Sequence, residues 1–405
     1  MSKGHVIIDI RKNNATEPER GSRKIHGPQA APGSCFSSAE VNRPRLPKVI
    51  ETEAQLDEVL TRPGALLVKF IKSVPSPLLI LGAGGKMGPT LAVLARRAAA
   101  RHPLDVIAVS RFRDPAARAW LEARGVKTVS CDLLEAEAVR RLPDAEAIVY
   151  LVGLKFGTAQ DPPTTWAMNT VVPLRALERY PHARIVALST GNVYPMTQVG
   201  GGGGEGGVPR AKPPKGGTPS GIGSLETAPL TPLGEYANAA VGRERIFEFC
   251  ARRQQTPVAL LRLFYAVELR YGVLVDLAQR VHLGQPIELA NGYFNCIWQG
   301  DANELILRSL ALAASPPSVW NLCRPETFSV RAVARRLGEL LGRPARFVGT
   351  EAPTALLGNS ARICAALGAP ATPLETMLHW IVHWVKLGGR NLGKPTHFEV
   401  RDGRY

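Results

Sequence analysis

An apolar run that leads directly into glycines marks the first place in this sequence where chemistry is expected. The segment reads Leu78-Leu-Ile-Leu-Gly-Ala-Gly-Gly-Lys-Met-Gly88. Glycines after a buried strand let the chain turn tightly, and an anion can then approach the backbone N–H groups of the following helix, whose dipole favours negative charge. The segment therefore predicts a loop that binds the pyrophosphate of a dinucleotide. The loop residues expected to contact it are Gly82, Gly84, Gly85, Lys86, Met87 and Gly88.

The residues after the next predicted strand bear on which dinucleotide binds. The segment 105–111 ends about where a carboxylate reads the ribose hydroxyls in NAD enzymes, but Ser110 and Arg111 stand there instead. A guanidinium suits the 2′-phosphate of NADP. Lys86 adds positive charge in the loop. Unless Arg111 and Lys86 are plain surface residues, the sequence favours NADP over NAD as the NAD(P) cofactor.

A histidine pair is the one arrangement that raises the question of a metal. His379 and His383 stand four residues apart on a predicted helix at 372–387, a spacing that can suit a metal ion. There is no glutamate between them in a metal-binding pattern and no obvious third ligand. Packing beside Trp380 and Trp384 explains them better, so no metal site is expected.

Short apolar or β-favouring runs, with helical stretches between the early ones, must position these residues. The runs lie at 78–81, 106–109, 126–131, 147–152, 184–188, 258–263 and 319–322. Buried strands that alternate with amphipathic helices indicate a parallel sheet covered on both faces. The sequence therefore predicts an α/β fold: a Rossmann-type doubly wound parallel sheet with a smaller C-terminal α/β substrate domain.

Composition along the chain suggests four segments. They are a disordered basic N-terminal extension at 1–50, a short helical lead-in at 51–76, an NAD(P)-binding Rossmann domain at 77–266, and a mainly substrate-side domain at 267–405, with a late strand near 319–322 returning to the sheet. A Gly/Pro-rich stretch at 198–223 predicts a flexible insertion, because it has too little apolar surface to offset its ordering entropy. It could act as a lid or be a loop without a role.

Charge and composition narrow the class of protein. The net charge is +16, but the excess outside residues 1–50 is dispersed, so nucleic acid is not expected as a partner. Anionic small molecules are also compatible with a positive charge. No apolar run reaches the length of about 18 residues that a membrane helix needs, and the first residues lack a secretory h-region. Six scattered cysteines without a C-x-x-C pair predict reduced thiols, hence a cytoplasmic protein.

Several motifs together resemble the extended short-chain dehydrogenase/reductase family, of the NAD-dependent epimerase/dehydratase kind to which UDP-galactose 4-epimerase belongs. The resemblance covers about residues 77–390. It rests on the glycine spacing of Gly82, Gly85 and Gly88, on Asp132-Leu133, on Gly153-Leu-Lys155, on Asn169, on Ser189-Thr-Gly-Asn-Val-Tyr-Pro195, and on Glu226, Pro229, Pro232 and Tyr236 in that order.

The resemblance implies roles for these positions. Asp132 and Leu133 would lie at the adenine, and Val152, Gly153 and Asn169 would also bind the cofactor. The implied catalytic residues are Thr190 to orient the substrate oxygen, Tyr236 as general acid/base and Lys155 as an electrostatic helper. The implied activity is hydride transfer at a hydroxyl or keto carbon of a sugar or sugar-derived substrate. The helices after Trp166 and Tyr236 would pair in a homodimer.

Two places depart from the family pattern. In the segment after the strand at 258–263 an asparagine is usual, whereas this chain has Phe264-Tyr265. The other departure removes a charge. The family has a lysine four residues after its active-site tyrosine, whereas this chain has Ala240. A free tyrosine has a pKa near 10, and a nearby cation lowers it by about 1–3 units. Three interpretations stay open: Lys155 replaces the lost charge; the nicotinamide cation and Thr190 suffice; or the protein is a weak or inactive NAD(P)-binding sensor or scaffold, or an RNA-binding protein on this fold.

Overall fold

The computed structural model describes residues 46–155, 157–199, 217–218, 222–394 and 396–403. Most of the predicted basic extension and of the predicted 198–223 insertion lies outside these residues. The last part of the extension differs from the expectation of disorder at 1–50. Ile50 is fully buried, and the Pro47 carbonyl accepts a hydrogen bond of 2.9 Å from the Trp380 indole. The folded part therefore begins before residue 51.

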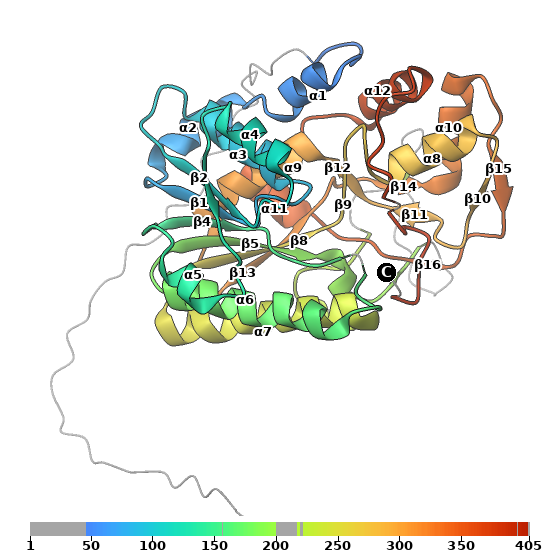
Figure 1. Cartoon of the computed structure of the whole chain (residues 1–405). Coiled ribbons are helices and arrows are strands. Elements are labelled where there is room, and N and C mark those ends of the chain that lie inside the picture. Colours follow the sequence, from blue (N-terminus) through green and yellow to red (C-terminus); the bar gives the residue numbers. More distant parts are fainter. Residues whose placement is uncertain (1–45, 156, 200–216, 219–221, 395, 404–405) are drawn as a thin grey trace, which may run out of the picture. The chain divides into compact units, whose positions relative to one another are not determined.

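Seven parallel strands form the central sheet, which confirms the predicted Rossmann-type fold (Figure 1). Their order is β3-β2-β1-β4-β5-β8-β13. The strands are β1 (Leu78–Leu81), β2 (Val106–Ser110), β3 (Lys127–Ser130), β4 (Ala147–Tyr150), β5 (Arg184–Thr190), β8 (Val258–Leu263) and β13 (Ser318–Leu322). The chain builds outward from β1 in one direction and then from β4 in the other. Ligands of such sheets bind beyond the carboxyl ends of the strands at this reversal.

Helices cover both faces of the sheet. In Figure 1, α5 (Ala136–Arg140), α6 (Pro162–Arg179) and α7 (Gly234–Gln254) lie on one face, and α3 (Gly88–Ala98), α4 (Pro115–Glu122), α9 (Gln299–Arg308) and α11 (Ala361–Leu367) lie on the other. Strand β1 shows why both faces are apolar. Leu78 and Ile80 pack into the core beneath α3, while Leu79 and Leu81 pack into the core beneath α6 and α7.

The C-terminal part builds a second apolar core and also returns to the sheet. Around that core lie α1 (Glu53–Leu60), α8 (Val273–His282), α10 (Val330–Leu341) and α12 (Leu374–Lys386). Its short strands are β9 (Tyr265–Val267) with β12 (Cys296–Trp298), β10 (Pro286–Glu288) with β15 (Arg346–Val348), and β11 (Tyr293–Phe294) with β14 (Thr327–Ser329). Because α9, α11 and β13 belong to the sheet layers, the chain crosses between the two cores more than once.

Both ends of the predicted insertion are paired with the C-terminal part. Strand β6 (Thr197–Gln198) pairs with β16 (Thr354–Ala355), and β7 (Gly217–Thr218) pairs with β14. The ends of this stretch are therefore anchored to the C-terminal part.

The remaining short elements complete the chain path. They are α2 (Ala65–Phe70), η1 (Ile71–Ser73), η2 (Gly191–Val193) and η3 (Ser309–Leu312). Within the described residues, no helix combines the length and the apolar character that a membrane span requires.

A buried polar network ties the carboxyl ends of three strands to α7. The Arg262 guanidinium lies 2.6 Å from the Glu244 carboxylate, and both side chains are almost fully buried. Ser189 donates to Glu244, and the Tyr194 hydroxyl accepts from Arg262 and donates to Asn321. A buried charge is tolerated when it is paired and hydrogen-bonded, as here. The network fixes β5, β8 and β13 against the helix that carries Tyr236.

Removing one partner of this network tests its weight in stability. Arg262→Met leaves the Glu244 carboxylate buried and unpaired, so we expect the free energy of unfolding to fall by about 3–5 kcal/mol in urea titrations followed by circular dichroism. The double variant Arg262→Met/Glu244→Leu should recover much of that loss. Arg118→Met, which breaks the exposed pair with Glu122, is the control and should cost less than about 1 kcal/mol. If Arg262→Met lowers the free energy of unfolding no more than Arg118→Met does, the buried ion pair does not contribute to stability as proposed.

Candidate functional site

The predicted phosphate loop connects β1 to α3 at the reversal of the strand order. Gly82 has a φ of +84°, and a Cβ there would lie 2.9 Å from the backbone and side chain of Val152. A Cβ at Gly88 would collide with the Ala83 backbone. Helix α3 begins at Gly88 without a side-chain cap, so its first N–H groups remain available to an anion. This strand, turn and helix give the geometry that a diphosphate requires.

A groove with a volume of about 360 Å³ opens beside this loop. Its walls come from the loop and from the segments that follow β2, β3 and β4. Among the predicted cofactor residues, it brings together Gly82, Gly84, Gly85, Ser110, Arg111, Asp132, Leu133, Val152 and Gly153. Such a volume is typical of small-molecule sites. The groove therefore has the place and size expected for the adenosine half of a dinucleotide.

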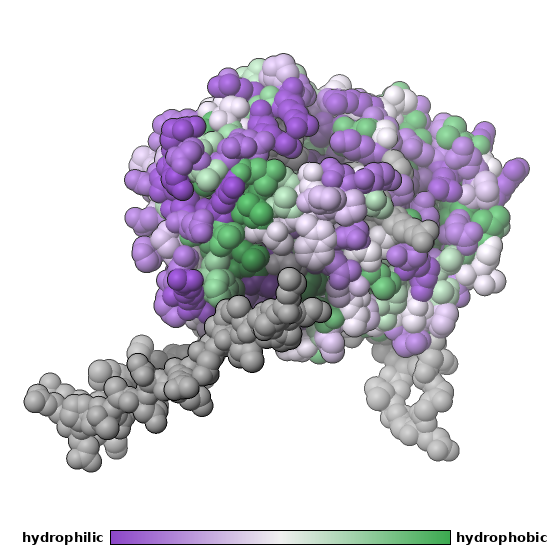
Figure 2. Space-filling model, turned by 60° about the horizontal axis from the view of Figure 1, so that its bottom comes forward, coloured by the Kyte–Doolittle hydropathy of each residue, from purple (hydrophilic) through white to green (hydrophobic). Residues whose placement is uncertain are grey.

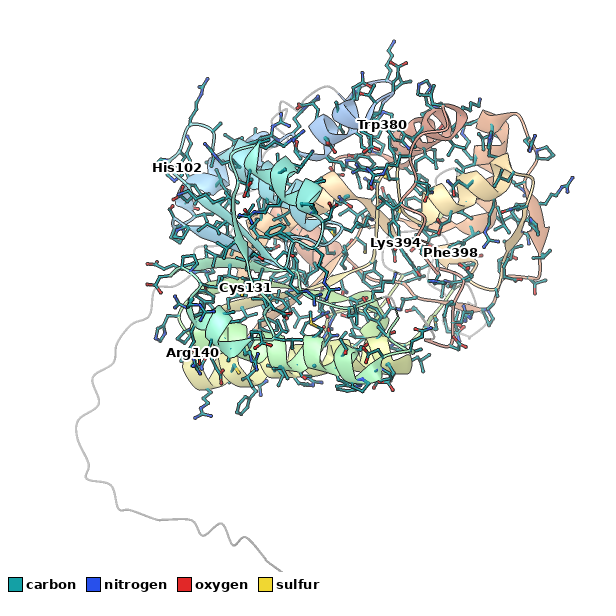
Figure 3. All side chains as sticks on the ribbon, in the orientation of Figure 1. His102, Cys131, Arg140, Trp380, Lys394 and Phe398 are labelled. Carbon is teal, nitrogen blue, oxygen red and sulfur yellow. The ribbon has the colours of Figure 1, made fainter. Side chains whose placement is uncertain are left out.

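Sequence reasoning missed part of the groove wall. The additional residues are Phe112, Arg113, Asp114, Ala117, Cys131, Leu151 and Met168. Most of them directly follow strands β2, β3 and β4, and that position was the available signal. Cys131, labelled in Figure 3, is one of these wall residues.

Two arginines stand at the end of the groove next to β2. The Arg111 guanidinium lies 3.7 Å from a carboxylate oxygen of Asp132, and both side chains are partly exposed. The other oxygen of Asp132 accepts a hydrogen bond of 3.0 Å from the Leu134 N–H. Arg113 lines the same groove. Asp114 lines it as well, and its carboxylate accepts a hydrogen bond of 2.9 Å from the Ala116 N–H at the start of α4. Two guanidinium groups and two carboxylates therefore stand at this end.

Asn169 does not line the groove but contacts it indirectly, through Arg243 and the Val152 carbonyl. Its side chain is buried on α6, accepts a hydrogen bond of 2.7 Å from Arg243 and donates one of 2.8 Å to the Thr165 carbonyl. Arg243 also donates to the Val152 carbonyl at 3.0 Å. A Cβ at Gly153 would lie 2.6 Å from Arg243. No local sequence pattern marked Arg243, which joins α7 to the end of β4.

Helix α7, which carries Tyr236, packs against β5 and against the η2 turn that follows it. Thr190 ends β5, and its hydroxyl donates 3.0 Å to the Asn192 side chain and accepts from the Asn192 N–H. Tyr236 is half-buried in the first turn of α7. Ala240, one turn later, is fully buried in an apolar cluster with Val193 and Phe264. The place after Tyr236 where the family pattern has lysine therefore carries no charge.

Two lysines direct their ammonium groups to backbone carbonyls that follow β8, Lys155 to Thr396 and Lys86 to Ala266. Lys155 donates a hydrogen bond of 3.3 Å to the Thr396 carbonyl, and burial lowers its pKa to about 8. Lys86 does not line the groove. Its nitrogen donates 2.9 Å to the Ala266 carbonyl and lies 3.9 Å above the Tyr271 ring. Burial, with repulsion from Lys155, lowers the pKa of Lys86 to about 7. Met87 and Gly88, also predicted to contact the cofactor, stand outside the groove wall.

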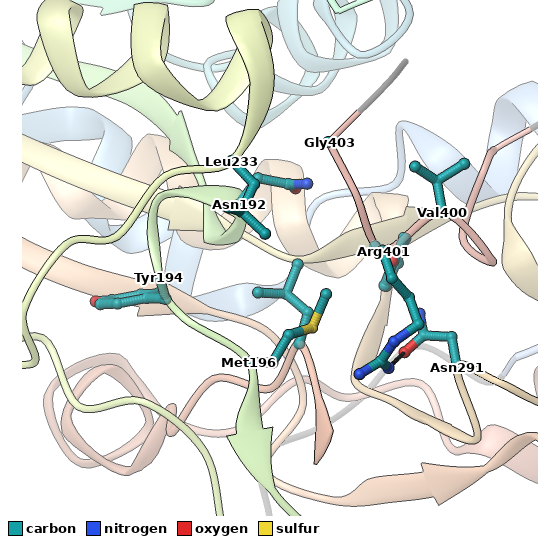
Figure 4. Close-up of a pocket in the computed structure, with 10 residues that line it drawn as sticks. Asn192, Tyr194, Met196, Leu233, Asn291, Val400, Arg401 and Gly403 are labelled. Atoms are coloured by element: carbon teal, nitrogen blue, oxygen red, sulfur yellow. Dashed lines mark hydrogen bonds between the residues drawn. The ribbon is translucent and has the colours of Figure 1, made fainter. Parts of the chain in front are cut away.

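The chain's own segment 396–403 closes the substrate side. A second cavity, of about 20 Å³, holds no more than about one water molecule. It lies between Asn192 and Leu233 on one side and Asn291 and Arg401 on the other (Figure 4). Arg401 donates to the Thr354 carbonyl and hydroxyl at 2.7 and 2.6 Å.

Further contacts hold the same segment near α8. The Thr396 hydroxyl donates 2.5 Å to Asp276, and Phe398, labelled in Figure 3, is buried in the core that α8 and α12 share. Burial raises the pKa of Asp276, while the Thr396 hydrogen bonds oppose that rise. The segment therefore covers the approach to Lys155 as well as the small cavity.

The histidine pair does not build a metal centre. His379 lies 3.2 Å from Glu375 on an exposed face of α12, and His383 lies 3.6 Å from Glu51. Among the described residues, no group of three His, Cys, Asp or Glu side chains is arranged to hold a metal ion.

Comparison with solved structures shows the same fold in sugar-nucleotide enzymes. A UDP-glucose 4-epimerase from Thermotoga maritima is 17% identical, with a TM-score of 0.57, over 76% of this chain and 98% of that one. A UDP-glucuronic acid 4-epimerase from Bacillus cereus, in complex with NAD, is 16% identical, with a TM-score of 0.58, over 76% of this chain and 96% of that one. A dTDP-glucose 4,6-dehydratase from Streptomyces venezuelae, with NAD bound, is 18% identical, with a TM-score of 0.59, over 76% of this chain and 97% of that one.

Sequence comparison gives the family. A search against curated protein sequences found no significant match. In contrast, the sequence model of the NAD dependent epimerase/dehydratase family matches residues 78–321. This span is more than half of the chain and runs from the first residue of β1 to β13, so it contains the phosphate loop, the groove and the candidate catalytic residues. The chain therefore belongs to the NAD-dependent epimerase/dehydratase family.

Proposed function

We propose that this protein is an NAD(P)-dependent oxidoreductase or epimerase that acts on a hydroxyl or keto carbon of a sugar or sugar-derived substrate. The observation that carries the proposal is the glycine turn from β1 to α3, which opens onto a groove of about 360 Å³ at the reversal of the strand order. Family membership and the fold shared with sugar-nucleotide epimerases and dehydratases support it.

The residues fit a dinucleotide. The turn around Gly82 and the uncapped start of α3 present N–H groups to the diphosphate, and Asp132 and Leu133 stand at the adenosine end. When bound, the nicotinamide supplies the hydride acceptor or donor. The chain's own part of the reaction is the proton: Tyr236 gives it to or takes it from the substrate oxygen, and Thr190 orients that oxygen. Lys155 supplies a cation on the substrate side.

The two guanidinium groups at the β2 end of the groove support NADP over NAD. Arg111 and Arg113 line the groove there and would bind a 2′-phosphate. The carboxylate that follows β2, Asp114, caps the start of α4 through the Ala116 N–H, and Asp132 follows β3.

The second candidate function is a dinucleotide-binding sensor or scaffold with little turnover. The observations that favour it are the buried apolar site of Ala240 and the closed substrate side beneath segment 396–403. Turnover discriminates the two functions: a sensor takes up the dinucleotide but oxidises or epimerises no member of a sugar panel.

Three coarser expectations stay proposals. We propose a division near residues 266–267 into a cofactor-binding part and a substrate-binding part. We also propose a cytoplasmic location, which the free thiols at the five described cysteines favour.

We also propose a homodimer through α6 and α7. Trp166 and Phe249 are 39% and 58% exposed on these helices. Figure 2 shows apolar patches between the hydrophilic residues of the visible face.

Dinucleotide uptake by the folded chain is the first test. Fluorescence titration with NADPH should show a saturable site, and Arg111→Gln/Arg113→Gln should weaken NADPH binding about tenfold or more while NADH binding changes little, because a charge-assisted hydrogen bond is worth about 1.5–3 kcal/mol. Arg124→Gln, outside the groove, is the matched control. Equal losses for both dinucleotides would count against NADP selectivity, and no uptake of either would end the proposal.

Proton transfer by Tyr236 is the second test. Tyr236→Phe should lower turnover of a sugar substrate by roughly 10²- to 10⁴-fold, the usual contribution of general acid/base catalysis, with dinucleotide affinity unchanged. Tyr180→Phe is the control, since Tyr180 follows the C-terminal end of α6 and its hydroxyl donates to the Pro143 carbonyl. Lys155→Met should also slow turnover, whereas Lys127→Met, on the surface beside Asp105, should not. Unchanged turnover in Lys155→Met would show that Lys155 does not replace the missing lysine.

A further inference from the structure

Lys86 stands in the phosphate loop, but its side chain does not serve the phosphate groove. The residue as a whole is half-buried, and its ammonium group points inward, 2.9 Å from the Ala266 carbonyl and 3.9 Å above the ring of Tyr271. Both contacts follow β8, on the far side of β4 and β5 from the groove. The backbone of the loop therefore faces the groove, whereas its one cationic side chain points to the opposite side, toward the residues that follow β8.

The strand order indicates which part of a bound dinucleotide would lie near the Lys86 ammonium. The groove residues follow β2, β3 and β4, so the adenosine end of a dinucleotide lies on that side and its diphosphate lies at the loop. The nicotinamide half must continue toward β5 and β8. Thr190 ends β5, and Ala266 lies just beyond β8. The Lys86 ammonium is thus on the nicotinamide side of the loop.

The charged groups around Lys86 leave its ammonium without an ion pair. Glu268 and Asp276 attract it and Lys155 and Arg270 repel it, but Glu268 is bound by Arg270 and Asp276 by Thr396. No described carboxylate lies within 4 Å of the Lys86 nitrogen. An ammonium has three N–H donors, and the described structure uses one of them, on Ala266.

We propose that Lys86 is the cation that faces the nicotinamide half of the dinucleotide and supplies the positive charge that Ala240 lacks. This inference rests on the proposed function, because it requires a dinucleotide in the groove. A cation at this place distinguishes the two redox states: it repels the pyridinium ring of the oxidised cofactor and leaves the neutral ring of the reduced cofactor unaffected. The protein should therefore bind the reduced cofactor in preference to the oxidised one.

Protonation makes this preference depend on pH. The pKa of Lys86 is lowered to about 7 by burial, with repulsion from Lys155 and Arg270 opposed by Glu268 and Asp276. Below this pKa the ammonium is charged, and above it the side chain is neutral. The oxidised cofactor should therefore bind relatively more weakly as the pH falls through about 7.

The test compares dissociation constants of oxidised and reduced dinucleotide with the full chain and requires no substrate. Between about pH 8.5 and about pH 6, the ratio of the oxidised to the reduced constant should rise roughly tenfold, as expected for two like charges at close range in a protein site. Lys86→Met should abolish this rise. Lys86→Arg, which stays charged, should show the high ratio at both pH values. Lys127→Met is the surface control and should behave like the parent chain.

The outcomes separate this inference from the proposed function. No uptake of either redox form by the folded parent chain overturns the proposed function. Uptake with the same pH dependence in the parent, Lys86→Met and Lys86→Arg overturns the role of Lys86 alone. Lys155→Met adds a further check: by removing a repelling charge it should move the midpoint of the pH dependence upward. If Lys155→Met itself abolishes the rise, the titrating cation is Lys155. Circular dichroism and dinucleotide uptake verify that each variant is folded.

Discussion

The close approach of Gly82 to the end of β4 is the constraint on which the site depends. The two strands that meet there, β1 and β4, start the two halves of the sheet, and the turn between β1 and α3 fits only because Gly82 has no side chain and a φ of +84°. This turn brings the start of α3, the Val152 and Gly153 backbone and the segment after β2 to one edge. A side chain at Gly82 would push β4 away and separate the two walls of the groove.

Two departures from the family pattern prove to be one structural feature. Ala240 on α7 and Phe264 after β8 belong to the same buried apolar cluster. A Cβ at Gly191 or Gly358 would contact the Phe264 ring from either side at under 3 Å. Ala240 and the aromatic ring between the two glycines therefore make this part of the site apolar, and the positive charge proposed to act near Tyr236 comes from Lys86 and Lys155.

The segment 396–403 sets the environment of the substrate side. It joins Asp276 on α8, Asn291 and Thr354 in the C-terminal part, and the start of α7 at Leu233. Contacts with that many separate elements keep water away from Lys155 and are one reason for its lowered pKa.

The sequence by itself determined the elements whose signal is local. The apolar runs and glycine spacing predicted the parallel sheet and the phosphate loop, because burial on both faces and a tight turn each leave a mark on neighbouring residues. The resemblance to a known family added Asp132, Leu133, Val152 and Gly153 to the groove residues that the loop and the end of β2 predicted. Only the tertiary structure decided where long side chains go. Lys86 reaches Ala266 across 180 residues of sequence, and Lys155 reaches Thr396 across 241. Such distant pairs carry no local pattern, because packing of the whole chain sets their direction, burial and charge.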